Sequence, residues 1–362
     1  MKNQLDEARK IINEVDREMA KLFEKRMQAA EMVAEYKKDR GLAIYDALRE
    51  EEVVRKNSAN IENEELREFY VSFLKNNMAV SRAYQSRLIS GMRVAYSGTR
   101  GAFAHIATEK LYPTAQKVAY PDFKSAYRAV ENGDCDICVL PVENSYNGEV
   151  GQVTDLMFSG SLYVNGMFDL PVTQDLLGVP GATLEDIKVV VSHPQAFGQC
   201  AGYIKKRSLT PHEFANTALA AKHVAELADN SVAAIASREA ADIFGLCVLD
   251  HDINENKTNS TRFAIFSRVA NKHVSKDSGV HSILLFTVRN EAGALATAID
   301  IIGKHGFNMR TLRSRPMKEL LWQYYFYVEL EGNIQTESGS SLMEALGEYC
   351  DRLKFAGAYV KI

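Results

Sequence analysis

Hydrophobic residues recur every three or four positions over residues 4–37, and this spacing predicts one long amphipathic helix. Arg26 interrupts the apolar seam, and Lys37 lies about three turns further on the same side. A guanidinium in an apolar seam needs a partner, so Arg26 either fixes the register of helix packing or forms part of an anion pocket. Lys37 favours the pocket, because two long cations can converge on one small polyanion. A solvated helix with scattered basic residues remains the alternative.

Arg9 lies too far along the same helix to reach this pocket. At 1.5 Å per residue it is roughly 42 Å from Lys37, so only a second chain could bring it there. Two further helices are expected over about residues 44–57 and 64–89. Three helices of which one is very long bury little within one chain, and this favours an intertwined dimer of an all-α module spanning residues 1–90.

After Ser90 and Gly91 the pattern changes to short apolar runs that alternate with helical segments. Over residues 92–268 it predicts an α/β domain with a largely parallel sheet, either compact or split into two lobes around a cleft. The expected strands are 93–97, 117–120, 137–142, 189–192, 232–236 and 263–267. A polar linker follows over 269–280. Residues 281–362 read βαββαβ, with the third strand starting at Trp322, and this order is the α+β ferredoxin-like plan.

Charge and composition exclude several classes of function. The 362 residues carry a formal net charge of -4, which gives no reason to expect nucleic-acid or membrane-surface binding. No stretch of 18 apolar residues occurs, and the polar N-terminus does not resemble a signal sequence, so we expect a cytoplasmic protein. Five cysteines fit reduced thiols better than a disulfide framework. Cys135 and Cys138 form a lone CxxC without a second ligand pair, so no metal site is predicted.

The N-terminal module gathers polar residues suited to a small dianion. Asp46, Arg49 and Glu50 share one helix face, as a surface ion-pair cluster also would, and Ser81 and Gln85 share another. These residues, together with Arg9, Arg26 and Lys37, would form a cationic pocket without a nucleophile. It could hold a dicarboxylate and stabilise charge on an ether oxygen.

This pattern over residues 1–90 closely resembles the all-helical chorismate mutases. The resemblance implies rearrangement of chorismate to prephenate by a pocket shared between two chains. Arg9 of one chain and Arg26, Lys37 and Arg49 of the other would grip the substrate. Lys37 and Gln85 would flank the ether oxygen, Glu50 would hold the hydroxyl, and Asp46 and Ser81 would complete the pocket.

In the middle region, short polar groups stand at strand ends or helix starts, where open α/β sheets bind ligands. They occur in Glu143-Asn144-Ser145, Ser192-His193-Pro194-Gln195, Asn216-Thr217 and Asn259-Ser260-Thr261-Arg262-Phe263, and each alone could be a helix cap or a turn.

These motifs resemble prephenate dehydratases, which implies a two-lobed domain of the periplasmic-binding-protein type. By resemblance, Thr261 would donate to the leaving hydroxyl or position its donor, Arg262 would pair with a carboxylate, and Phe263 would pack beside the ring. Lining the same cleft would be Glu143, Asn144, Ser145, Ser192, His193, Gln195 and Thr217. His193 precedes Pro194 and could instead shape the turn. Ala102 and Ala104 stand where the family usually has hydroxyl side chains.

The last region resembles ACT regulatory domains. Gly293, Ala294 and Leu295, with Arg313, Ser314, Arg315 and Pro316, match segments that bind phenylalanine in this family. Arg313 replaces the usual glutamate of the second segment.

The three resemblances together predict a multidomain, bifunctional chorismate mutase/prephenate dehydratase without metal or cofactor. Its expected partners are chorismate, prephenate, L-phenylalanine as effector, and further copies of the chain in a dimer or tetramer. An amino-acid-binding regulator would leave Arg26, Lys37 and Gln85 unexplained. A fusion to prephenate dehydrogenase would need a GxGxxG after a strand, and the middle region has none.

Overall fold

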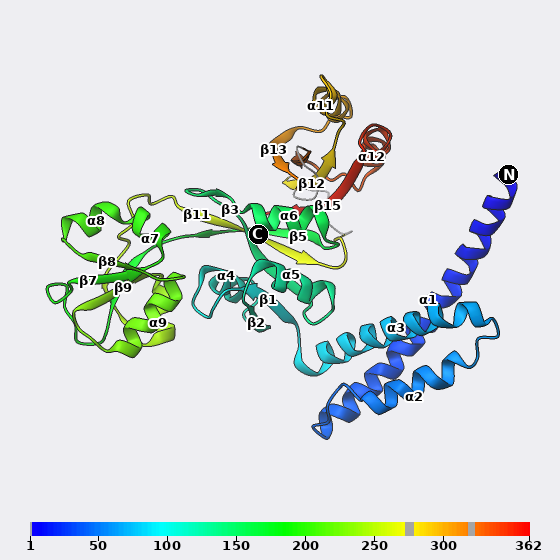
Figure 1. Cartoon of the computed structure of the whole chain (residues 1–362), viewed down its shortest axis with the longest axis horizontal. Coiled ribbons are helices and arrows are strands. Elements are labelled where there is room, and N and C mark those ends of the chain that lie inside the picture. The colour runs from blue at the N-terminus through cyan, green and yellow to red at the C-terminus, as the bar shows by residue number, and fades with distance from the viewer. Residues whose placement is uncertain (1, 272–278, 318–322) are drawn as a thin grey trace. The chain divides into compact units, whose positions relative to one another are not determined.

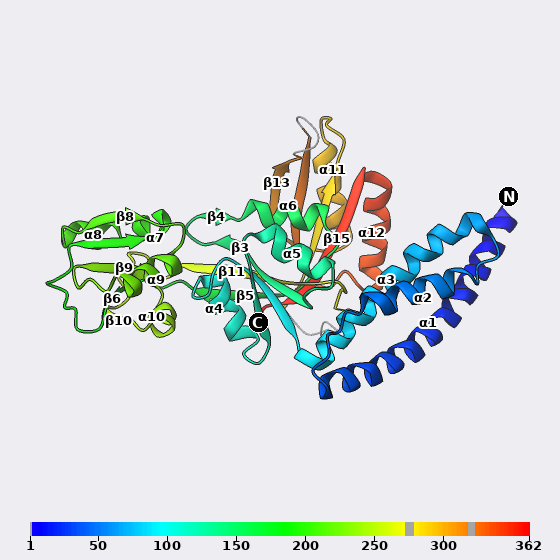
Figure 2. The same ribbon diagram turned by 60° about the horizontal axis from the view of Figure 1, so that its bottom comes forward.

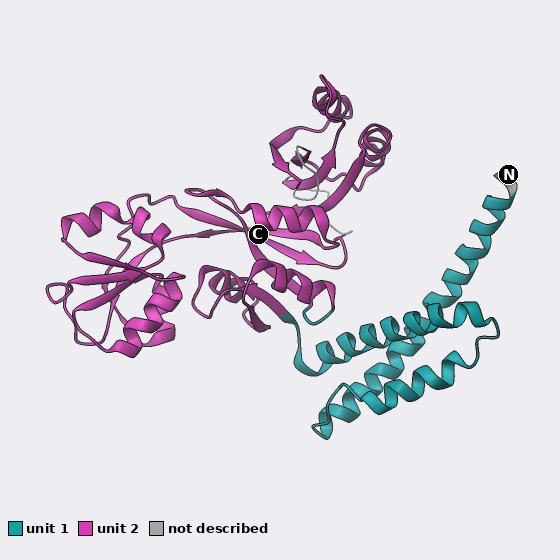
Figure 3. Ribbon diagram, in the orientation of Figure 1, with its two compact units in different colours: residues 1–93, 133–135 teal, residues 94–132, 136–362 magenta. Residues whose placement is uncertain are grey.

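The computed structural model describes residues 2–271, 279–317 and 323–362. The chain divides into two compact units, one of residues 1–93 with 133–135 and one of residues 94–132 with 136–362 (Figure 3). No helix within the described ranges is both long and apolar enough to cross a membrane.

The first unit consists of three helices, as the hydrophobic spacing predicts (Figure 1): α1 (Lys2–Asp39), α2 (Ala47–Ser58) and α3 (Glu64–Ser90). The side chains of Asp46 and Asn63 cap α2 and α3 by accepting hydrogen bonds from backbone N–H groups. Both α1 and α2 pack against α3. Apolar side chains of the N-terminal half of α1 stay exposed, with Val15 at 51% and Leu22 at 65%. The apolar seam of α1 is therefore not covered by its own chain.

The second unit begins with a lobe built on a six-stranded sheet of order β2-β1-β3-β11-β5, with β4 paired to β3. Helices α4, α5 and α6 pack against this sheet (Figure 2). Its elements are β1 (Arg93–Ser97), α4 (Phe103–Leu111), β2 (Gln116–Tyr120), α5 (Phe123–Glu131), β3 (Ile137–Asn144), β4 (Gly148–Glu149), α6 (Gly151–Ser159), β5 (Tyr163–Pro171) and β11 (Ser260–Ser267).

A second lobe is inserted between β5 and β11 and has a five-stranded sheet of order β10-β6-β9-β7-β8. Its elements are β6 (Asp175–Gly178), β7 (Val189–Ser192), α7 (Pro194–Gln199), α8 (Ala201–Lys206), β8 (Thr210–Glu213), α9 (Thr217–Leu227), β9 (Val232–Ala236), α10 (Arg238–Phe244) and β10 (Cys247–Asp250).

The expectation of a largely parallel sheet is wrong, because both sheets are mixed. Strand β5 leads out of the first lobe and β11 returns to it, so β11 runs antiparallel to both β5 and β3. Parallel pairs remain between β1 and β3 and between β7 and each of β8 and β9.

The C-terminal domain has the predicted βαββαβ order and a sheet of order β13-β14-β12-β15. Its elements are β12 (Val280–Thr287), α11 (Ala294–Lys304), β13 (Met309–Pro316), β14 (Tyr324–Glu331), α12 (Glu337–Tyr349) and β15 (Arg352–Val360). Trp322 and most of the expected linker lie outside the described residues. Strand β15 packs on β5, where a Cβ at Gly357 would lie 2.1 Å from the Val164 carbonyl oxygen. Only glycine permits this approach, which joins the domain to the first lobe.

Candidate functional site

A cleft of about 550 Å³ lies between the two lobes of the second unit. Four helices begin at it, because Phe103 of α4, Val150 just before α6, Gln195 of α7 and Thr217 of α9 all line it. Helix N-termini present unpaired N–H groups and a partial positive charge, both of which favour anions. The described residues that line the cleft include neither Lys nor Arg. Glu149, a carboxylate of this lining, is paired with Arg315, so the groups that the cleft offers to an anion are neutral donors.

Thr261 and Asn144 meet on the cleft side of neighbouring strands. They are register partners in the β3–β11 pair, and Asn144 Nδ2 donates a hydrogen bond of 2.9 Å to Thr261 Oγ1. The Asn144 amide oxygen accepts from the backbone N–H groups of Tyr146 and Asn147, which holds the amide in this orientation. Because Asn144 occupies a lone pair of the Thr261 hydroxyl, the hydroxyl proton remains available to a ligand.

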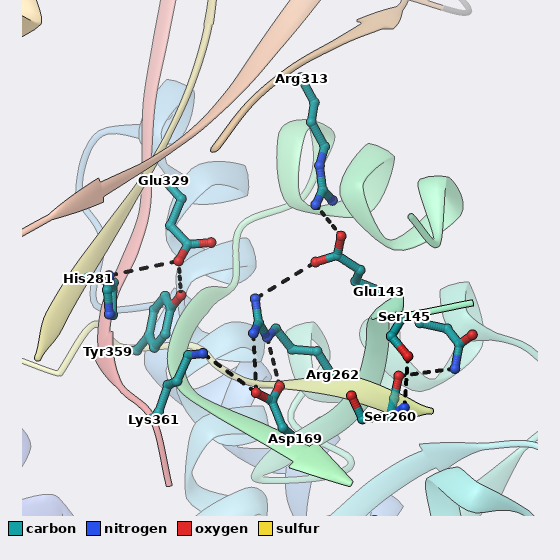
Figure 4. Close-up of polar contacts among 11 residues, drawn as sticks. Glu143, Ser145, Asp169, Ser260, Arg262, His281, Arg313, Glu329, Tyr359 and Lys361 are labelled. Carbon is teal, nitrogen blue, oxygen red and sulfur yellow. Dashed lines mark hydrogen bonds and ion pairs between the residues drawn. The ribbon is translucent and has the colours of Figure 1, made fainter. Parts of the chain in front are cut away.

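Glu143 and Arg262 lie next to these residues in the chain but point to the opposite face of the sheet. Side chains alternate along a strand, so the pair Arg262 and Glu143 cannot face the same way as Thr261 and Asn144. Arg262 forms a bidentate ion pair with Asp169, with Nε 2.8 Å and Nη2 3.2 Å from its carboxylate oxygens (Figure 4). Arg262 Nη1 also lies 3.8 Å from Glu143 Oε2.

Two further polar groups of the second lobe face the cleft. His193 caps α7, because its Nδ1 accepts from the Gln195 backbone N–H at 3.2 Å. The proton of a neutral His193 is thereby placed on Nε2. Gln174 is 2% exposed and donates to Gln199 Oε1 at 3.2 Å, while its own Oε1 has no hydrogen-bond partner. A substrate donor could satisfy this oxygen.

In the helical unit, a second polar site forms between α1 and α3. Arg26 donates to the Ser81 hydroxyl and, at 3.3 Å, to the Asn77 carbonyl. Burial lowers the pKa of Arg26. Gln85 lies one turn beyond Ser81, is 8% exposed, and its Oε1 has no hydrogen-bond partner. A cation and a buried amide thus lie on one face of this unit.

Comparison with known proteins assigns the helical unit and the two-lobed domain to one enzyme family. Residues 8–86 match the family model "Chorismate mutase type II", and residues 94–271 match "Prephenate dehydratase". The bifunctional chorismate mutase/prephenate dehydratase of Neisseria gonorrhoeae is 31% identical over 97% of this chain and 95% of its own length. The enzyme of that name from Aquifex aeolicus is 29% identical over 99% of this chain and 98% of its own. The chain belongs to the bifunctional chorismate mutase/prephenate dehydratase family.

A solved structure supports the fold of the dehydratase part of this bifunctional enzyme. The prephenate dehydratase of Arthrobacter aurescens, solved in complex with L-Phe, superposes with a TM-score of 0.69 at 25% identity. The match covers 74% of this chain and 90% of that protein. The bifunctional enzyme therefore converts chorismate to prephenate in its helical unit, and prephenate to phenylpyruvate in the two-lobed domain.

Of the residues that the sequence predicts for the dehydratase, six line the cleft: Asn144, His193, Gln195, Thr217, Thr261 and Phe263. Four do not. Glu143 and Arg262 face the opposite side of the sheet, for the reason given above. Ser192 is fully buried and donates to the Ile235 carbonyl at 2.6 Å, while Ser145 pairs with Asn259 at 3.3 Å. Ala102 and Ala104 do line the cleft, without hydroxyls.

The mutase residues are only partly brought together within one chain. Lys37 donates to the Ile44 carbonyl, Arg49 pairs with Glu52 at 2.6 Å, and Glu50 pairs with Arg82. Asp46 serves as the cap of α2. Arg9 is exposed on the N-terminal part of α1, roughly 42 Å along the helix from Lys37.

In the C-terminal domain, the two predicted effector segments have different surroundings. Gly293 lies at φ 85 immediately before α11, which starts with Ala294 and Leu295. Ser314 and Pro316 are exposed on β13, whereas the side chains of Arg313 and Arg315 point into the first lobe. Both arginine side chains are engaged with that lobe, and the sequence did not indicate these contacts.

Proposed function

We propose that the interlobe cleft binds prephenate through helix N-termini and amides, and that Thr261 donates a hydrogen bond to the departing ring hydroxyl. The hydrogen bond from Asn144 to Thr261 Oγ1 is the observation that carries this role. A threonine hydroxyl is too weak an acid to transfer its proton fully, but its hydrogen bond strengthens as charge develops on the leaving oxygen.

The reaction requires no further redox partner. The ring carboxylate leaves as CO₂, the electrons of its broken C–C bond complete the aromatic ring, and the hydroxyl leaves as water after taking up one proton. The absence of Lys and Arg from the described cleft lining suits this step. A cation paired with the departing carboxylate would stabilise the ground state more than the transition state.

For the mutase, we propose a pocket completed by Arg9 of a second copy of the chain. Two observations support it: the uncovered apolar side chains on the N-terminal half of α1, and the length of α1 between Arg9 and Lys37. Burying such a face against a second copy would bring the partner's N-terminal half toward Arg26, Ser81 and Gln85. In this arrangement Lys37, Arg49 and Glu50 would exchange their present partners for substrate.

We also propose that the C-terminal domain is an ACT domain that binds L-phenylalanine and reduces dehydratase turnover. Its ferredoxin-like sheet order and the L-Phe complex of the Arthrobacter aurescens protein support this assignment. A cytoplasmic location remains a prediction from the sequence.

The deciding experiment follows chorismate to its end product with purified full-length protein, without added metal or NAD. Phenylpyruvate is the expected product, and a strict requirement for NAD would refute the proposal. Thr261→Val should abolish phenylpyruvate formation while prephenate accumulates. Continued phenylpyruvate formation by this variant would remove Thr261 from the reaction.

The shared mutase pocket is tested by mixing two inactive variants, Arg9→Met and Arg26→Met, through joint refolding. If each pocket takes Arg9 from one chain and Arg26 from the other, mixed dimers regain one intact pocket, and about a quarter of the wild-type turnover returns. No recovery in a mixture shown to contain mixed dimers would mean that both arginines act within one chain.

A further inference from the structure

Two arginines of the C-terminal domain extend into the first lobe behind the cleft. Arg313 and Arg315 are two residues apart on β13, so both side chains lie on the same face of the strand. Arg313 Nη2 forms an ion pair with Glu143 Oε1 (Figure 4). Arg315 Nη1 lies 3.5 Å from Glu149 Oε2, and its Nε lies 2.9 Å from Asp155 Oδ1.

The two glutamates face each other across one hairpin. Glu143 on β3 and Glu149 on β4 are direct register partners, and the next pair is Asn144 with Gly148. Asn144, Gly148 and Glu149 line the cleft. The hairpin that carries Asn144 into the cleft is therefore held from outside by one arginine on each strand.

Arg315 also rests against the start of α6. A Cβ at Gly151 would lie 2.1 Å from Arg315 Nη1, so a larger residue there would displace the guanidinium from its present position. The Tyr325 hydroxyl donates to Asp155 Oδ1 at 2.7 Å and accepts from Arg315 Nε at 3.0 Å. The guanidinium of Arg315 is thus held by Asp155 and Tyr325 as well as by Glu149.

The ion pair between Arg313 and Glu143 is the first of a series of ion pairs on the face of the sheet away from the cleft. Glu143 lies between Arg313 and Arg262. Arg262 pairs with Asp169, whose Oδ2 is also 3.6 Å from Lys361 Nζ (Figure 4). Charges of alternating sign therefore run from β13 to β11 next to Thr261.

We propose that Arg313 and Arg315 are positioning residues for the dehydration of prephenate, because they hold the β3–β4 hairpin, and with it Asn144 and Thr261, through Glu143 and Glu149. Neither arginine lines the cleft, so both act through the hairpin. A displacement of β13 would move the hairpin directly, which connects the C-terminal domain to the cleft. The inference rests on the proposed roles of Asn144 and Thr261.

The test uses the full-length chain with Arg313→Met, Arg315→Met and both together. Arg310→Met is the matched control, because Arg310 is an exposed arginine of the same strand that pairs with Glu331 at 3.6 Å. We expect kcat for prephenate to fall about tenfold in each single variant and further in the pair, since small displacements of catalytic groups cost this much or more. Chorismate mutase turnover in the same samples should stay unchanged, as should both activities of Arg310→Met.

Two additional variants distinguish positioning from general destabilisation. Arg313→Lys keeps the charge and should restore most of the lost kcat. In a Glu143→Gln background, Arg313→Met should have little additional effect, because the contact through which it acts is already weakened.

Unchanged kcat and KM in the Arg313→Met/Arg315→Met pair would overturn the inference, as would fully additive effects with Glu143→Gln or an equal loss of both enzyme activities. Thr261→Val keeps this result separate from the proposed function. If Thr261→Val is inactive while the arginine pair is normal, only the positioning role fails. If Thr261→Val dehydrates prephenate normally, the proposed role of Thr261 in the cleft is refuted, and the positioning role that rests on it is refuted as well.

Discussion

Replacing Asn144 with aspartate should remove the support of the Thr261 hydroxyl while leaving the local turn in place. The amide oxygen of Asn144 accepts from Tyr146 N at 3.0 Å and from Asn147 N at 2.9 Å, and a carboxylate oxygen can accept both. The amide nitrogen donates to Thr261 Oγ1, and a carboxylate at this position has no proton to donate. The Thr261 hydroxyl would then donate its proton to the new carboxylate rather than to the substrate.

The size of the effect follows from the loss of one transition-state donor. Such losses cost about 3 kcal/mol, so kcat for prephenate should fall about 10²-fold or more. The new carboxylate would also face two acceptors, Asn259 Oδ1 and the Ser260 carbonyl, each now 3.1 Å from Asn144 Nδ2. We therefore expect the free energy of unfolding to fall by about 1–3 kcal/mol. The kinetics should be measured well below the unfolding temperature of the variant, so that the enzyme is still folded.

The assay measures phenylpyruvate formation from prephenate, with mutase turnover in the same sample as a check on folding. Asn165→Asp is a matched control, because Asn165 Nδ2 donates to the Ser267 hydroxyl at 2.5 Å near the other end of β11. In a Thr261→Val background, Asn144→Asp should reduce kcat little further. If Asn144→Asp keeps kcat within twofold of wild type, the reasoning is refuted.

Three further perturbations test separate parts of the molecule. Arg26→Met should lower mutase kcat/KM about 10²-fold and leave prephenate turnover unchanged, because Arg26 contacts Ser81 in the helical unit; a loss of both activities would contradict separate sites. Ser192→Ala should lower the free energy of unfolding in urea by about 1–2 kcal/mol, by removing the 2.6 Å bond to the Ile235 carbonyl, and should leave prephenate turnover unchanged if Ser192 only supports the fold. Burial lowers the pKa of Lys354 to about 8, so the folded chain binds fewer protons than the unfolded chain between about pH 8 and 10.5. Wild-type stability should therefore rise relative to Lys354→Met over that range, and a constant difference would show that Lys354 does not titrate there.

The elements that sequence predicts well are those whose own residues decide their burial. Helix α1 follows from its apolar spacing, and β7 and β9 follow from continuous apolar runs, all close to the observed bounds. Strand β5, by contrast, is not predicted by the hydrophobic pattern of residues 163–171. Asn165, Gly166 and Asp169 interrupt its apolar run, and β5 is stabilised by its pairing with β11 and by β15 packing on it. Such a strand depends on segments that lie about 100 residues (β11) and about 190 residues (β15) further along the chain, which local patterns do not reveal.

In the candidate cleft, too, local sequence patterns predict some residues and miss others that depend on distant segments. Asn144 and Thr261 belong to recognisable motifs, whereas Gln174 and Gln199 are isolated glutamines that become cleft residues only through the closeness of the two lobes. The placement of Arg262 in the cleft is wrong for a reason available in the sequence. Once residues 260–267 are a strand, Thr261 and Arg262 must face opposite sides.

This alternation also explains how one short segment serves two purposes. Thr261 and Asn144 turn neutral polar groups toward the cleft in which we propose that prephenate loses its carboxylate. Arg262 and Glu143 turn their charges outward, where Asp169 and Arg313 neutralise them. Strands β3 and β11 therefore carry neutral polar groups on the face toward the cleft and ion-paired residues on the opposite face. A one-residue slip of β11 against β3 would exchange the two faces and place an unpaired arginine in the cleft. The ion pairs behind the sheet therefore help to fix the register on which the proposed dehydratase site depends.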